Sequence, residues 1–161
     1  MGDAVVRDIR SKSASLLQGI RRTIRAMDDE TLAKPSSGWQ LWKQCYHLLY
    51  WLDHWFVDPL SFAPPSFHQS DFMDPGIVSP IGLCKGQLLE YLGLIECRIE
   101  HYLGELSAEE LQRQYEVRGR IRSRLDMILG QFSHVSHHIG YICATVRAVT
   151  GKSIWEDESR G

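Results

Sequence analysis

The sequence predicts an all-α protein, a four-helix bundle with a long ordered loop between its second and third helices. Four long segments place apolar residues three and four positions apart, which is the period of a helix with one buried face. Polar or proline-containing connections separate these segments, and none shows the apolar–polar alternation of a half-buried strand. Helices of this kind bury their apolar faces against one another, and the result is a bundle.

The first helix is expected from about residue 4 to 27, with Arg and Asp on the face that points away from the core. Its apolar face comprises Val5, Ile9, Ser13, Leu16, Ile20, Ile24 and Met27. A polar connection follows, and Ser36 and Ser37 are expected to cap a second helix from about Trp39 to Val57. Pro59 ends that helix.

The segment 58–76 contains four prolines and many aromatic residues. It is too apolar for a disordered linker and too interrupted for a regular element. We therefore expect an ordered loop of the kind that often covers a site. Ser79 and Pro80 then resemble a helix start, so a third helix is expected from there to about Gly104.

Two more helices are expected in the C-terminal third of the chain. Ser107 with Glu110 forms a capping-box pattern for a short helix or turn over 107–115. The last long helix is expected from about Arg122 to Thr150, with Gly151 ending it in a left-handed conformation. Its apolar face comprises Leu125, Ile128, Phe132, Val135, Ile139, Ile142, Val146 and Val149. Trp155 is placed to fold back onto the bundle.

Length and composition predict one soluble domain over residues 1–161. The chain is 43% hydrophobic and 24% charged, with a net charge of −2. Its basic residues are scattered, and the densest run, RGRIRSR (118–124), lies among turn-like residues, which argues against nucleic-acid binding. No apolar run approaches the ~20 residues that span a bilayer. Charges stand where a signal peptide would have its apolar core, so we expect a cytoplasmic protein.

The four cysteines offer no structural framework. Cys45, Cys84, Cys97 and Cys143 lie far apart and form no CxxC pair, whereas a disulfide scaffold or a zinc knuckle needs tighter clustering. We interpret them as small apolar residues on helix faces. The histidines are the better candidates for chemistry.

Three histidines have the pattern of a metal site. His134 and His138 are four residues apart, so both side chains lie on one face of the last helix, where two imidazoles can bind one ion. That pair alone is more often a pair of ordinary core or surface histidines. His47 strengthens the signal, because it lies among aromatic and aliphatic residues where an unpaired imidazole would be costly to bury. Three imidazoles from two facing helices leave coordination positions free, as in catalytic sites.

The other histidines are weaker candidates. His137 is rotated by roughly 100° from His138 and cannot share its direction. His54 lies about 10 Å farther along its helix than His47, and we keep it as an alternative ligand. His68 and His101 are interpreted as ordinary surface or capping histidines.

Two segments, WQLWKQCYHLL (39–49) and HVSHHIGYICATVRAVTG (134–151), together with helix order and length, resemble the DinB-like (YfiT-like) metal-dependent superfamily. The resemblance implies a four-helix bundle that holds a divalent metal, nickel or zinc, and by position it makes His47, His134 and His138 the ligands. The family often continues its histidine motif with Gly-Gln, whereas Tyr141 follows Gly140 here. Tyr141 either alters the pocket or anchors the helix through packing. We assign Gly140 to close packing with another backbone, and Arg147 to either a structural ion pair or a substrate anion.

The resemblance implies a metal-dependent enzyme, either a thiol-dependent S-transferase or a related hydrolase that acts on a small molecule. A low-molecular-weight thiol and a small electrophile would then be its partners. The catalytic acid or base is not identified, and Asp53 and Glu100 are candidates by helix position only. The alternative is a non-catalytic, stress-associated metal-binding bundle that forms a homodimer through its many aromatic residues.

Overall fold

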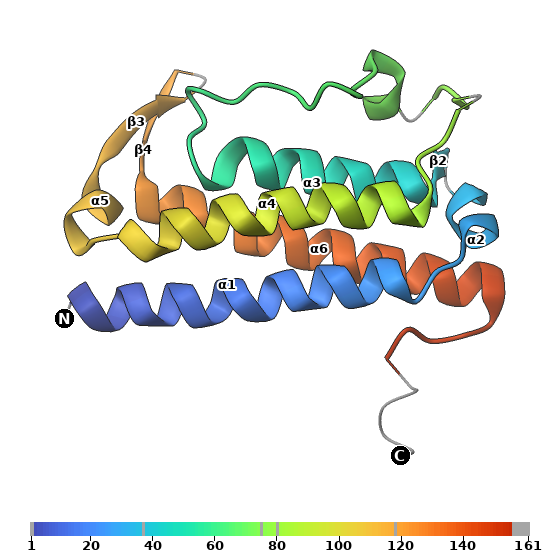
Figure 1. Cartoon of the computed structure of the whole chain (residues 1–161), viewed down its shortest axis with the longest axis horizontal. Coiled ribbons are helices and arrows are strands. Elements are labelled where there is room, and N and C mark those ends of the chain that lie inside the picture. Colours follow the sequence, from blue (N-terminus) through green and yellow to red (C-terminus); the bar gives the residue numbers. More distant parts are fainter. Residues whose placement is uncertain (1, 37, 75, 80, 118, 156–161) are drawn as a thin grey trace.

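A computed structural model describes residues 2–36, 38–74, 76–79, 81–117 and 119–155, and it confirms the all-α four-helix bundle (Figure 1). The four long helices are α1 (Gly2–Arg25), α3 (Leu41–Phe56), α4 (Lys85–Glu105) and α6 (Arg124–Thr150). Helix α1 packs against both α4 and α6, and α3 also packs against both of them. The short helices are α2 (Asp29–Ala33), η1 (Ser70–Met73) and α5 (Ala108–Gln112).

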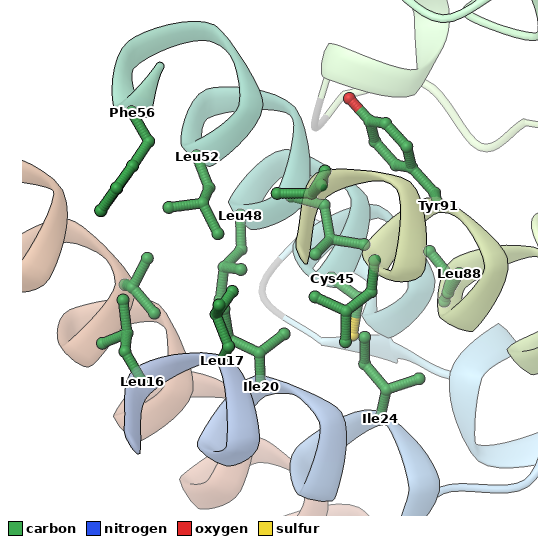
Figure 2. Packing of buried hydrophobic residues seen from close by; sticks show 14 of the residues in the cluster. Leu16, Leu17, Ile20, Ile24, Cys45, Leu48, Leu52, Phe56, Leu88 and Tyr91 are labelled. Carbon is green, nitrogen blue, oxygen red and sulfur yellow. The ribbon is translucent and has the colours of Figure 1, made fainter. Parts of the chain in front are cut away.

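The core forms where the predicted apolar faces meet. Ile20 and Ile24 of α1 are each 1% exposed and lie beside Cys45 and Leu48 of α3 (Figure 2). Ser13 shares the buried face of α1, because its hydroxyl donates to the carbonyl of Ile9 at 2.8 Å and so remains hydrogen-bonded. Burial of such a continuous apolar face is what stabilises an amphipathic helix in a bundle.

The long loop between α3 and α4 is ordered, as predicted, and one lysine holds it. Lys43 of α3 is completely buried, and its Nζ donates to the backbone carbonyls of Asp71, Asp74 and Ile77 at 2.5, 3.0 and 2.6 Å. Phe72 packs beside it, with its ring 5.0 Å from that of Trp42. The loop is thereby fixed across the bundle (Figure 1).

Two predicted helix starts are wrong. The second long helix begins at Leu41, and its N-cap Gln40 makes no side-chain cap; Ser36 lies in strand β1, and Ser37 lies outside the described residues. Helix α4 begins at Lys85, where Gln87 Oε1 accepts from the backbone N–H of Cys84 at 3.0 Å.

The predicted start at Ser79 and Pro80 fails because Ser79 has another partner. Its hydroxyl donates to the carboxylate of Asp71 at 2.6 Å, which ties it into the loop. Pro80 lies outside the described residues.

Two short antiparallel hairpins were not predicted. One pairs β1 (Pro35–Ser36) with β2 (Trp39–Gln40), and the other pairs β3 (Gln114–Val117) with β4 (Arg120–Ser123). Gly119, beside the turn of the second hairpin, has φ of 72°, a left-handed value that favours glycine. The basic run that was interpreted as turn-like therefore forms mostly one strand of this hairpin.

The N-cap of α5 and the C-cap of α6 agree with prediction. Ser107 Oγ accepts from the backbone N–H of Glu110 at 3.1 Å, and Gly151 ends α6 with φ of 71°. Trp155 folds back, and the guanidinium of Arg22 lies 4.3 Å from its ring centroid. None of the described helices is both long and apolar enough to cross a membrane.

Arg124 joins the start of α6 to the end of α3. It is fully buried, and its Nη atoms donate to the carbonyls of Trp55 and Val57 at 3.0 and 2.9 Å, while Nε donates to Tyr102 at 2.7 Å. These carbonyls belong to the last turn of α3 and to its C-cap Val57, where backbone acceptors lack helical partners. The contact fixes the alignment of α3 beside α6, on which the site depends.

Candidate metal centre

The structure brings the three predicted histidines together between α3 and α6. His47 comes from α3, and His134 and His138 come from successive turns of α6. One nitrogen from each ring can be chosen so that all three lie within 4.8 Å of one another. The ring centroids of His47 lie 4.8 Å from His138 and 5.8 Å from His134, and those of the α6 pair are 4.5 Å apart. This spacing suits three ligands of one ion.

The imidazoles are half-buried and incompletely hydrogen-bonded. The Nδ1 atoms of His47, His134 and His138 are buried and have no hydrogen-bond partner. Two indoles flank His47, with Trp39 at 5.3 Å in an edge-on arrangement and Trp51 at 6.2 Å. Because a buried polar atom without a partner is unfavourable, these rings do not behave as satisfied core histidines, and the donor set fits a divalent metal.

Burial keeps these rings neutral. Desolvation, with a smaller contribution from His134, lowers the pKa of His47 to about 4. Desolvation and the neighbouring histidines lower that of His138 to about 3, and burial also lowers the pKa of His134. At neutral pH each ring therefore has a lone pair available for a metal.

The remaining histidines lie elsewhere. His54, kept as an alternative ligand, packs against Trp55 and Phe62 with centroid distances of 4.3 and 4.5 Å, and it does not join the group. His137 is exposed. His68 shares a hydrogen bond of 2.7 Å with the hydroxyl of Tyr46. His101 is exposed and lies 4.0 Å from a carboxylate oxygen of Glu105.

The candidate acids are not part of the three-histidine group. Asp53 is buried, and its carboxylate accepts from Tyr91 at 2.8 Å and from Arg98 at 2.7 Å. Burial nevertheless raises the pKa of Asp53, against these two partners. Glu100 is exposed on α4. No Asp, Glu or Cys joins the three imidazoles in the part of the chain that the structure describes.

The other residues singled out near the histidine motif lie outside the group of three imidazoles. Gly140 is exposed, and a Cβ added there would meet nothing within 4 Å among the described residues, so the expected close packing is wrong. Tyr141 is half-buried, and Arg147 is exposed in the last turn of α6.

The cysteines are free thiols, and burial raises the pKa of Cys45 to about 12.

Sequence reasoning missed the residues around the cluster. Trp51 follows His47 by one helical turn, and Gln131 precedes His134 by three residues, so helical spacing alone places both on the faces that carry the histidines. Gln131 is only 9% exposed, and its Oε1 has no hydrogen-bond partner.

Without metal, the folded protein is expected to lose stability as the pH falls from about 6.5 towards about 4. The three rings are neutral in the folded state, whereas in the unfolded chain they gain protons below about 6.5. Each ring lowers the free energy of unfolding by at most about 1.4 kcal/mol per pH unit. Urea unfolding of chelator-treated protein at several pH values measures this dependence.

The control for that measurement is the double variant His47→Gln, His138→Gln, whose amides do not titrate. Protonation of carboxylates affects both proteins alike, so the wild type should show the steeper dependence. Parallel pH profiles would contradict buried neutral imidazoles.

Comparison with solved structures shows the fold. The chain is similar to a DinB-like protein from Bacillus cereus, with a TM-score of 0.70 and 12% sequence identity, over 91% of this chain and 93% of that one. No protein-family model matches the sequence, and no curated protein matches it significantly. The chain therefore has the fold of a DinB-like protein.

Proposed function

We propose that the chain is an enzyme that depends on a divalent metal, nickel or zinc, bound by His47, His134 and His138. The observation that carries this proposal is the group of three convergent imidazoles with no fourth protein ligand among the described residues. Three protein ligands and an open position are typical of catalytic metal sites, whereas structural sites are closed by four. Imidazole ligands suit both metals.

We favour thiol S-transfer over hydrolysis as the reaction. A bound divalent ion would keep a thiol deprotonated at neutral pH or would activate water. Hydrolysis asks more of a protein base, and the candidate Asp53 is engaged by Tyr91 and Arg98. In transfer, the sulfur of a low-molecular-weight thiol forms a bond to carbon of a small electrophile as the leaving group departs, and the thiol proton passes to solvent.

The experiment is a pair of assays on metal-loaded protein. Reduced glutathione with 1-chloro-2,4-dinitrobenzene reports transfer, and p-nitrophenyl acetate reports hydrolysis. We expect transfer above the buffer rate, lost on chelation and restored by nickel or zinc. His47→Ala should be inactive. His137→Ala, which removes the exposed histidine next to His138, should retain activity.

A protein that binds metal stoichiometrically but accelerates neither reaction would favour the alternative, a non-catalytic homodimeric bundle. That alternative has one observation in its support, a set of exposed apolar side chains on the loop and α4. They are Leu60 at 72%, Ile77 at 46%, Val78 at 74%, Ile81 at 65% and Leu94 at 55% exposed. Light scattering would then have to give twice the chain mass of 18.5 kDa.

A further inference from the structure

A groove of about 800 Å³ opens between the end of α3, the β3–β4 hairpin and the first turns of α6. Its lining residues are Trp55, Val117, Arg120, Ile121, Arg122, Asp126 and Gln131. Two of these are arginines from one short strand, and one is a largely buried amide. The groove therefore combines an aromatic surface with cationic and hydrogen-bonding groups.

The charges in the groove favour an anion. Nε of Arg122 donates to the carboxylate of Asp126 at 2.6 Å, so this pair is internally balanced. Arg120 is exposed and forms no ion pair with any described residue. The ionised side chains of the lining, two guanidiniums and one carboxylate, thus sum to one net positive charge. A guanidinium presents paired N–H donors that match a carboxylate.

Arg122 and Gln131 both line the groove. The Arg122 guanidinium lies against α6, where a Cβ added to Gly130 would be 3.5 Å from its Nη2. The Oε1 of Gln131 accepts no hydrogen bond although it is buried. Rotation about the terminal bond of the glutamine can turn this oxygen towards the groove. A ligand N–H there would supply the missing partner.

A row of aromatic rings connects the groove to the histidines. On α3 the Trp51 ring lies 6.2 Å from His47 and 6.3 Å from Trp55, in a stacked arrangement with the latter. On α6, Gln131 lies three residues from His134. The eight residues from His47 to Trp55 correspond to about 12 Å along a helix. An extended chain of three to four residues covers that distance.

We propose that this groove binds the carboxylate-bearing arm of a peptide-like low-molecular-weight thiol whose sulfur is directed to the three-histidine site. The proposal rests on the proposed function and specifies its co-substrate. Arg120 and Arg122 bind the carboxylate, Gln131 accepts from an amide N–H of the ligand, and the Trp51–Trp55 row supports its middle. A thiol without a carboxylate lacks these contacts and binds only through sulfur.

The test uses the full chain loaded with cobalt(II), because sulfur coordination gives a charge-transfer band in the near ultraviolet. Reduced glutathione and 2-mercaptoethanol are titrated anaerobically into wild type and the double variant Arg120→Gln, Arg122→Gln. We expect the variant to bind glutathione about tenfold more weakly and 2-mercaptoethanol equally well. Arg25→Gln, an exposed arginine of α1, is the matched control and should behave as wild type.

Failure of this proposal and failure of the thiol function give different results. S-methylglutathione, whose sulfur carries no proton, is titrated by calorimetry into the same proteins. If S-methylglutathione binds in a way that depends on Arg120 and Arg122, but neither thiol gives a cobalt band, the groove is supported and the thiol function is overturned. Equal affinity of wild type and the double variant for both glutathione probes would overturn the groove.

Gln131→Leu provides an independent check. Since leucine removes a buried acceptor without a partner, the melting temperature should be unchanged or higher, with full cobalt content. Glutathione affinity should nevertheless fall severalfold. A lower melting temperature with unchanged affinity would show that Gln131 is structural and overturn its role.

Discussion

Replacing His138 by alanine is expected to lower the affinity of the chain for nickel or zinc by more than about 100-fold. Loss of an outer-shell partner alone typically costs 10–100-fold, and His138 is a proposed direct ligand. Its ring is central to the group, 4.8 Å from that of His47 and 4.5 Å from that of His134. His47→Ala should have a similar effect, because it removes the contribution of α3.

The measurement is elemental analysis of protein purified without an affinity tag or chelator, followed by competition with a chromophoric chelator. About one metal per chain is expected for wild type and little for either variant. His137→Ala and His54→Ala are the controls, since neither ring belongs to the group of three. The ring of His137 lies 5.3 Å from that of His138, and the ring of His54 lies 5.4 Å from that of Trp51. Circular dichroism verifies that each variant is folded.

Two results would overturn the site. One is a wild-type protein that cannot be loaded with nickel, zinc or cobalt. The other is equal loss of metal from His137→Ala and His138→Ala, which would indicate a loose surface cluster. In either case the unpartnered Nδ1 atoms would need another explanation.

The helices and their buried faces could be predicted because periodicity records burial directly. Val135 and Ile142 of α6 fall on the expected face and are at most 1% exposed. His134 and His138 could be paired because i, i+4 spacing fixes their geometry on one helix. The position of His47 beside this pair depends on how α3 packs against α6, and spacing within one helix does not encode that packing. His47 could be proposed as a third ligand only from its apolar surroundings and from the family resemblance.

The β3–β4 hairpin was missed because its pattern is weak. In Arg120–Ser123 charged residues flank an exposed Ile121, so the alternation has no buried apolar side to reveal it. The role suggested for Asp53 depended on helix position, and the partners Tyr91 and Arg98 that hold it are 38 and 45 residues away in the chain. Long-range side-chain pairs of this kind leave no local signal in the sequence.

The role of Lys43 could not be predicted from the sequence either, because its partners are backbone carbonyls, which every residue type carries. Its Nζ is buried with three acceptors from the loop, 28 to 34 residues farther along the chain. Lys43→Met preserves the length of the side chain but leaves these carbonyls without their donor. We expect a loss of about 2–4 kcal/mol in the free energy of unfolding.

Urea unfolding measures the stability of Lys43→Met, and limited proteolysis with mass spectrometry locates the change. Because Lys43 fixes the loop to α3, new cleavage should fall within 58–84, while the four long helices stay protected. Lys12→Met, at an exposed position of α1, removes the same charge without a buried partner and should match wild type. Unchanged stability together with an uncleaved loop would mean that Phe72 and its aromatic neighbours hold the loop by packing alone.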